Sequence, residues 1–198
     1  MKKPSEIVDE VFEMYARFGN ADYIGEPVSQ LEHMSQSAQL AIDEGFDDEV
    51  VLAAFFHDIG HICVMNSSQS PDHIASGTMG GYGMKSHERI GADYLRSCGF
   101  PERVAKLVEN HVQAKRYLTY RYPDYYQQLS EASKKTLEYQ GGVMSEVEAF
   151  AFETDPLFET SILMRKWDEL AKETNIPVLD LQILRKKAML MLEMQFQA

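Results

Sequence analysis

Residues 48–61 read DEVVLAAFFHDIGH, and this stretch decides the fold. The seven consecutive residues from Val50 to Phe56 are all apolar, so the helix they predict has no polar face and is expected at the centre of the molecule. The adjacent pair His57 and Asp58 follows directly. Successive side chains leave a helix about 100° apart, so both can reach one buried point where elements converge. A buried His-Asp pair needs a partner that compensates for its lost hydration.

Similar groups recur along the chain, and together they predict a metal site. The gap from His33 to His57 is 24 residues, and the gap from His87 to His111 is again 24. Imidazoles and carboxylates are the mixture that iron, manganese and zinc accept. The candidate ligands are His33, His57, Asp58, His87, His111 and Asp168. Six ligands exceed the need of one tetrahedral ion and suit two ions that share a bridging carboxylate. The alternative, six unrelated residues, is disfavoured because histidine is seldom fully buried.

Composition predicts a globular protein with one domain over residues 1–198. Hydrophobic residues make up 44% of the 198 residues and charged residues 25%. No apolar run reaches the roughly 18 residues of a membrane span. The first 15 residues carry acidic side chains where a signal peptide needs an apolar stretch, so we expect the cytoplasm. Cys63 and Cys98 are not spaced as a metal pair and are expected to stay reduced.

The charge balance disfavours one class of partner. Lys plus Arg number 19 and Asp plus Glu 31, which gives a net charge of −12. A chain this acidic repels the phosphate backbone, so nucleic-acid binding is not expected. A local basic pocket for a small anion remains compatible with this charge. The sequence carries no signal for an oligomeric state.

Helical periodicity covers almost the whole chain, and no alternating strand pattern appears. Asp47 and Ser86 stand at the expected N-caps of two helices, and Gly60 is expected to end the central helix. Residues 62–85, which include His73, are expected to form a long loop. Helices are predicted at 7–18, 31–41, 49–61, 87–100, 102–118, 122–129, 131–139, 146–152, 157–173 and 180–196. The predicted class is all-α, an irregular bundle around a metal site.

The run AAFFHDIGH resembles the signature of the HD-domain superfamily, which consists of a first His, a His-Asp doublet and a distant Asp. His33, the doublet His57-Asp58, and Asp168 match these positions. The added His87 and His111 are similar to the subset that holds two metals. Most members are phosphohydrolases, so metal-dependent hydrolysis of a nucleotide or small phosphate ester is the alternative function. A third hypothesis is a non-catalytic ligand-binding HD module.

A second resemblance narrows the choice, and it covers the chain from Tyr23 to about Lys172. The segment YIGEPVSQLEH at 23–33, His61, Lys115 and the run RKWD at 165–168 resemble the PhnZ-type oxygenases. These are mixed-valent di-iron enzymes that cleave carbon–phosphorus bonds. The resemblance implies an O2-dependent oxidoreductase. Its substrate would be a 1-hydroxy-2-(amino or trimethylammonio)ethylphosphonate, converted to phosphate and glycine or glycine betaine.

The same resemblance implies a role for each site residue. His33, His57, Asp58 and Asp168 would hold one iron of an Fe(II)/Fe(III) pair. Asp58 would bridge to the second iron, which also takes His87 and His111. Tyr23 would cap the first iron until substrate binds, and Glu26 would accept a hydrogen bond from the substrate's amine. The residues implied to hold the phosphonate are His61, Lys115, Ser133 and Thr136.

Each of these residues also has an ordinary structural interpretation. Tyr23 and Glu26 suit an exposed loop, and Lys115 suits a solvated helix end. Ser133 and Thr136 suit the cap and first turn of a short helix. The offsets of three and ten residues from Tyr23 to Glu26 and His33 favour the functional interpretation of that loop.

Overall fold

The computed structural model describes residues 2–23, 25–67 and 77–197, and within them the chain is built from α-helices. The predicted all-α class is confirmed, since these residues add only two isolated β-bridges. The helices are α1 (Pro4–Phe18), α2 (Gln30–Asp43), α3 (Asp48–Phe56), α4 (Ile59–Met65), α6 (His87–Cys98), α7 (Glu102–Arg121), α8 (Pro123–Gln128), α9 (Glu131–Tyr139), α10 (Glu146–Glu153), α11 (Phe158–Leu170) and α12 (Leu181–Gln197).

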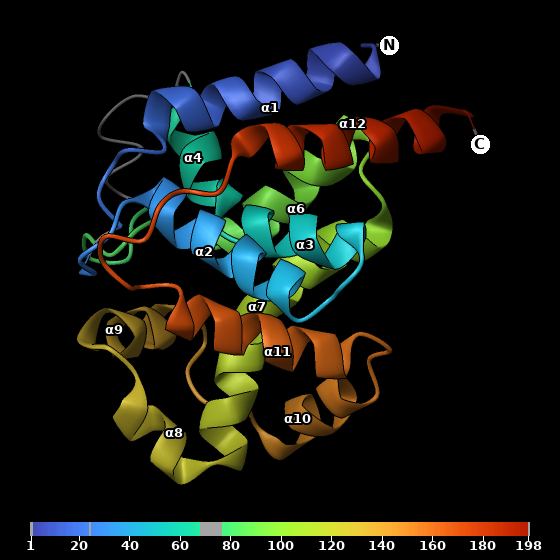
Figure 1. Cartoon of the computed structure of the whole chain (residues 1–198). Helices are drawn as coiled ribbons and strands as arrows, with labels where there is room; N and C mark the ends of the chain where they lie inside the picture. The colour runs from blue at the N-terminus through green and yellow to red at the C-terminus, as the bar shows by residue number, and fades with distance from the viewer. Residues whose placement is uncertain (1, 24, 68–76, 198) are drawn as a thin grey trace.

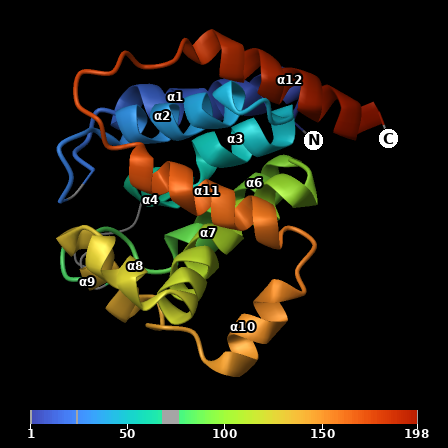
Figure 2. The same ribbon diagram turned by 60° about the horizontal axis from the view of Figure 1, so that its bottom comes forward.

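Helix α3 lies inside a ring of other helices, as its apolar sequence predicts. It packs against α2, α7, α11 and α12. Helices α1 and α12 run side by side along one face, at the top of Figure 1. The short helices α8, α9 and α10 lie at the opposite end, below α11 (Figures 1 and 2). The chain therefore encloses α3 from several sides and places its C-terminal end deep in the molecule.

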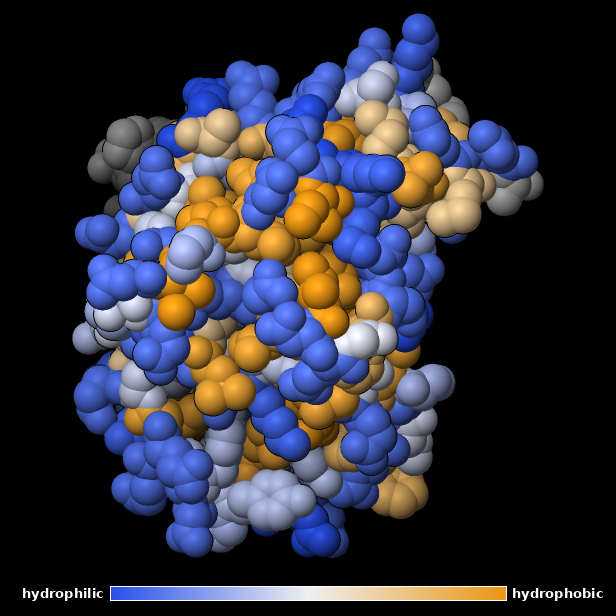
Figure 3. All heavy atoms as spheres, viewed as in Figure 1, coloured by the Kyte–Doolittle hydropathy of each residue, from blue (hydrophilic) through white to orange (hydrophobic). Residues whose placement is uncertain are grey.

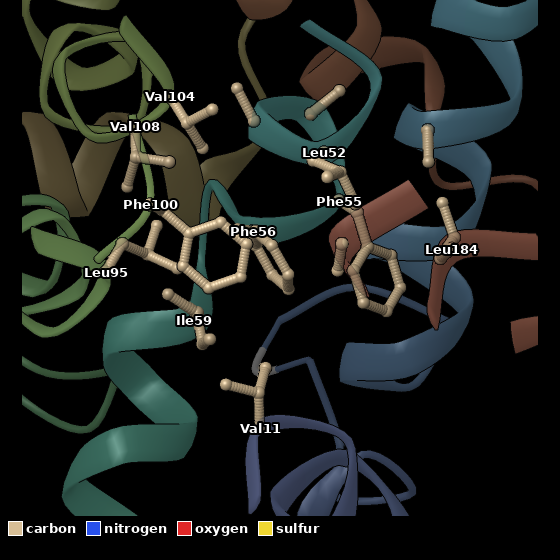
Figure 4. Close-up of a cluster of buried hydrophobic side chains, with 14 of the residues drawn as sticks. Val11, Leu52, Phe55, Phe56, Ile59, Leu95, Phe100, Val104, Val108 and Leu184 are labelled. Carbon is tan, nitrogen blue, oxygen red and sulfur yellow. The ribbon is translucent and has the colours of Figure 1, made fainter. Parts of the chain in front are cut away.

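The main core is formed around the residues of α3. All seven residues from Val50 to Phe56 are at most 1% exposed. In Figure 4, Phe55 and Phe56 lie among apolar side chains from other helices, including Val11 and Leu184. Burial of each large apolar side chain contributes roughly 1.5–3 kcal/mol, so this cluster is a main source of the free energy of folding. It holds the end of α3 in a fixed position.

The predicted single helix over 49–61 is wrong, and so is the role given to Gly60. Helix α3 ends at Phe56, the His57-Asp58 pair forms the junction, and α4 continues to Met65. Gly60 lies inside α4, where a Cβ atom would stand 2.0 Å from the carbonyl oxygen of His87. Glycine is needed here because α4 crosses the start of α6 closely.

The long loop predicted over 62–85 also begins later than expected. Helix α4 takes its first residues as far as Met65. Residues 68–76, with His73, lie outside the described residues. The described part after them contains a bridge between Thr78 and Met84.

The other helix boundaries follow the sequence with two corrections. Asp47 caps α3 by accepting a hydrogen bond from the amide of Val50 at 3.1 Å, as predicted. Ser86 precedes α6, but its backbone is left-handed at φ 56° and its side chain makes no cap hydrogen bond, so the predicted cap is wrong. Helix α11 ends at Leu170 and not at Glu173, which leaves Lys172 outside the helix.

Apolar residues reach the surface in separate patches between hydrophilic side chains on the face seen in Figure 3. No helix among the described residues is both long enough and apolar enough to cross a lipid bilayer.

We expect Gly60→Ala to lower the free energy of unfolding by roughly 1–3 kcal/mol or more, because the new methyl group must push the α4–α6 crossing apart. Urea unfolding of both proteins measures this difference. Gly45→Asn is the matched control, because Gly45 has φ 78° and a Cβ atom there would meet nothing within 4 Å, and asparagine tolerates this conformation. A Gly60→Ala protein as stable as the wild type would contradict the proposed crossing.

Candidate metal centre

Four buried histidines have the same ring orientation toward the backbone, and this fixes their tautomer. Each Nδ1 lies within hydrogen-bond distance of a carbonyl oxygen, which can only accept. The pairs are His33 with Ala171 at 2.9 Å, His57 with Ala54 at 2.8 Å, His87 with Met84 at 3.1 Å and His111 with Val108 at 2.7 Å. The proton of each neutral ring is therefore on Nδ1, and each Nε2 has a free lone pair.

These free nitrogen atoms face one another in two pairs. The Nε2 atoms of His33 and His57 are 3.0 Å apart, and those of His87 and His111 are 3.1 Å apart. Two unprotonated nitrogens cannot form a hydrogen bond with each other. Burial lowers the pKa of His57, and lowers that of His111 to about 3, which keeps these rings neutral. Burial also opposes protonation of His87, but its hydrogen bond to Asp58 outweighs burial and raises its pKa. A metal cation that accepts both lone pairs removes this conflict for His33 and His57, and for His87 and His111 it can take the place of a proton on His87.

Asp58 lies between the two histidine pairs and directs one carboxylate oxygen to each. Its Oδ2 is 3.8 Å from Nε2 of His33 and 3.6 Å from Nε2 of His57. Its Oδ1 is 3.1 Å from Nε2 of His87 and 3.5 Å from Nε2 of His111. Burial opposes ionisation of Asp58, but the hydrogen bond and charge of His87 outweigh it and hold the pKa of Asp58 well below the usual range. The carboxylate is therefore an anion placed to bridge two cations.

Asp168 completes the first group from the far end of the chain. Its Oδ1 is 3.4 Å from Nε2 of His33 and is buried without a hydrogen-bond donor. Its Oδ2 pairs with Arg165, one turn earlier on α11. Burial raises the pKa of Asp168, yet the charge of Arg165 holds it well below the usual range. A buried anionic oxygen with no donor is costly, so a cation at this point is strongly favoured.

The donor set therefore fits two metal ions. One group consists of His33, His57 and Asp58, with Asp168 beside it, and the other of Asp58, His87 and His111. All six predicted ligands meet at one place, although they come from α2, the α3–α4 junction, α6, α7 and α11. The set contains imidazoles and carboxylates without a thiolate, which iron, manganese and zinc all accept.

A small cavity of about 50 Å³ opens beside the metal centre. By the same measure one water molecule needs roughly 10–15 Å³, so the space suits a ligand of a few heavy atoms. The cavity brings the predicted substrate residues to the metal ligands. Its lining includes Tyr23, Glu26, Asp58, His61, His87, His111, Lys115, Ser133, Thr136 and Asp168.

His61 lines this cavity with the opposite tautomer to the four paired histidines. Its Nδ1 accepts a hydrogen bond from the amide of Met84 at 3.1 Å, so the proton of the neutral ring is on Nε2. Burial lowers its pKa to about 3, which keeps the ring neutral. The ring stacks on His87, and Gly83 leaves room for it, since a Cβ there would lie 2.6 Å from Cε1 of His61. His61 therefore offers an N–H donor where the other histidines offer lone pairs.

Lys115 supplies the cationic side of the cavity. Its side chain is only 3% exposed, and its Nζ donates to the hydroxyl of Thr136 at 2.9 Å. Burial, with a smaller contribution from Arg165, lowers its pKa to about 7. Ser133 lies one turn before Thr136 on α9, so both hydroxyl groups line the cavity with the ammonium group. An anion that entered here would meet a buried charge it could neutralise.

Tyr23 and Glu26 lie beside the centre, in the segment before α2. The ring of Tyr23 stacks on His33 at 4.0 Å between ring centroids. Burial raises its pKa well above the usual range, so it is a protonated phenol. The Oε1 atom of Glu26 accepts hydrogen bonds from Ser130 at 2.6 Å and Lys172 at 2.7 Å.

Three further polar residues line the cavity. Gln30 and Arg165 were marked in the sequence only as parts of the runs at 23–33 and 165–168, and Gln140 was not marked at all. Each of the three has a buried side-chain atom without a hydrogen-bond partner. Their spacing carried a signal, because Gln140 lies one helical turn after Thr136, and Arg165 one turn before Asp168. Glutamine and arginine are too common on helix surfaces for that spacing to select them.

We expect Asp58→Ala to lose both metal ions, because it removes the shared ligand and leaves two cations facing each other without a bridging anion. His111→Ala should lose one ion, since His33, His57 and Asp168 remain. Metal analysis after loading and desalting counts ions per chain, and circular dichroism checks the fold. Wild-type protein that saturates at one ion would reject the two-metal centre.

Comparison with known proteins agrees with this geometry. The HD domain family model matches residues 30–144. A hydroxymethylphosphonate dioxygenase of Gimesia maris is 38% identical over 91% of this chain and 86% of its own length. The glycine-betaine-forming [1-hydroxy-2-(trimethylamino)ethyl]phosphonate dioxygenase of Leisingera caerulea is 36% identical over 88% of this chain and 84% of its own. The uncharacterized protein L432 of Acanthamoeba polyphaga mimivirus is 44% identical over 87% and 75%. The chain belongs to the HD domain family.

Proposed function

We propose that this protein is an O2-dependent di-iron dioxygenase that cleaves the carbon–phosphorus bond of a small 1-hydroxyphosphonate. One observation carries the proposal: the small cavity is lined both by part of the two-metal donor set and by His61 and Lys115, two buried side chains that could donate to an anion. The two named relatives support it, because both are phosphonate dioxygenases that align over most of the chain. The choice of iron rests on the resemblance to PhnZ-type oxygenases.

The proposed reaction balances without an added reductant. A 1-hydroxyphosphonate and one O2 give one carboxylic acid and one phosphate, and all four electrons taken up by O2 come from the substrate. The 2-amino substrate would give glycine, the 2-trimethylammonio substrate glycine betaine, and hydroxymethylphosphonate formate. When bound, the iron pair supplies the redox chemistry of O2.

The side chains of the cavity would hold the substrate for this reaction. The ammonium of Lys115 and the Nε2–H of His61 would donate to the phosphonate oxygens, because a dianion is held best by charged and directed donors. Ser133 and Thr136 would add hydroxyl donors. These contacts would place the hydroxyl-bearing carbon against the metal ligands and keep water away from it.

The loop before α2 would control access to the first metal. Tyr23 lies against His33, so its phenol is close enough to cover an open coordination position until substrate arrives. Glu26 lines the same cavity and would meet the substituent on the hydroxyl-bearing carbon.

We expect phosphate release from these phosphonates to require O2. Iron-loaded protein should release one phosphate per O2 consumed under air and none in an anaerobic chamber, measured by a phosphate assay and an oxygen electrode. The rival hypothesis is metal-dependent hydrolysis of a phosphate ester. Equal phosphate release with and without O2 would favour that hypothesis over the dioxygenase.

We expect Lys115→Ala to raise the KM for substrate roughly 10- to 100-fold, because loss of a charged hydrogen bond costs about 1.5–3 kcal/mol. Its metal content should stay at the wild-type value, since Lys115 is not a metal ligand. Lys134→Ala is the matched control, because Lys134 lies on α9 and pairs with the exposed Glu131. Unchanged substrate affinity in Lys115→Ala, measured by titration calorimetry, would reject the assignment.

A pH series tests the charge of Lys115 separately. With a pKa of about 7, its ammonium is lost as the pH rises through neutrality. Lys115→Arg keeps its charge at higher pH, so the wild-type KM should rise relative to that of the variant between pH 6 and 8.5. Ionisation of the substrate affects both proteins equally, so it does not change the ratio of the wild-type KM to the variant KM. A constant ratio would contradict the lowered pKa.

A further inference from the structure

Glu26 holds an ion pair that the sequence did not predict. A single carboxylate oxygen, Oε1, accepts from Nζ of Lys172 at 2.7 Å and from the hydroxyl of Ser130 at 2.6 Å. The side chains of Glu26 and Lys172 are only 9% and 15% exposed. An ion pair this well shielded is screened little by salt. The carboxylate is therefore neutralised by the protein itself.

The position of Lys172 is fixed by the metal centre. The residue before it, Ala171, is fully buried, and its carbonyl oxygen holds Nδ1 of His33 at 2.9 Å. The amide of Lys172 also bonds to the carbonyl oxygen of Leu170 at 2.9 Å, directly after the end of α11. Because the backbone at Lys172 is anchored, its ammonium group stays close to Glu26 and has a high effective concentration there.

The carboxylates of the described cavity lining either belong to the metal donor set or already pair with a lysine. Among the described residues that line it, the carboxylates are Asp58, Asp168 and Glu26. The first two belong to the metal donor set, so Glu26 is the one that could meet a cationic group of a substrate. Lys172 already supplies that cation. The cavity thus has donors for an anion and no uncompensated carboxylate for an ammonium group.

We propose that Lys172 determines substrate specificity, and that the preferred substrate is a 1-hydroxyphosphonate without a cationic amine, with hydroxymethylphosphonate as the smallest member. This inference rests on the proposed function. A substrate ammonium must displace Lys172 from Glu26 or bind the same carboxylate beside it. Two cations held on one carboxylate repel each other. A substrate without an amine leaves the Glu26–Lys172 pair intact.

The test compares kcat/KM for hydroxymethylphosphonate, 1-hydroxy-2-aminoethylphosphonate and its trimethylammonio analogue. Wild-type protein should prefer hydroxymethylphosphonate. Lys172→Met should raise kcat/KM for the amine-bearing substrates relative to hydroxymethylphosphonate about tenfold or more, since a charged hydrogen bond no longer competes. Lys172→Arg keeps the cation and should keep the wild-type ratio. Lys166→Met, an exposed lysine on α11, is the matched control.

The outcomes separate this inference from the proposed function. A wild-type preference for an amine-bearing substrate, or a Lys172→Met ratio equal to the wild type's, overturns the role of Lys172 and leaves the dioxygenase intact. A merely structural role would lower kcat/KM for all three substrates together without changing their ratio, and this also overturns it. Failure to release phosphate from any of the three under O2 overturns the proposed function and this inference with it.

Discussion

The placement of one carboxylate, Asp58, between two pairs of histidine nitrogens is the constraint on which the rest of the structure depends. Its two oxygens face different pairs, and the rings of each pair direct their Nε2 atoms toward each other. Such a group of buried lone pairs and anionic oxygens is unfavourable unless cations occupy it. The packed core around α3 holds Asp58 in this position despite the unfavourable burial. The helix stops at Phe56, so that the junction, and not a helix face, carries the His-Asp pair.

Two kinds of backbone contact hold the ligands in position. Three histidines bond to the carbonyl oxygen three residues earlier, so local geometry sets their rings. His33 instead bonds to Ala171, after the end of α11. This long-range bond connects α2 to the segment that carries Asp168 and Lys172. The metal centre and the cation that pairs with Glu26 are therefore positioned by the same contact.

Much of the fold was predictable because helical periodicity and apolar runs depend on local sequence. Five of the six candidate ligands were also predictable, since repeated His spacing and the HDIGH run mark them, and the resemblance to the HD-domain signature added Asp168. The break after Phe56 was not, because the approach of His87 to Gly60 is a tertiary contact. The Glu26–Lys172 pair joins residues 146 positions apart, and no local pattern shows it. The tautomer of His61 depends on Met84 in the same way.

Anomalous diffraction at the iron edge, from crystals of anaerobically loaded protein, tests whether Asp58 bridges two metal ions. We expect two iron peaks about 3.5–4 Å apart, as in other two-metal sites, with one oxygen of Asp58 on each. One peak should lie with His33, His57 and Asp168, and the other with His87 and His111. A single peak at full loading, or two peaks with Asp58 bound to only one of them, would show that Asp58 does not bridge two metal ions.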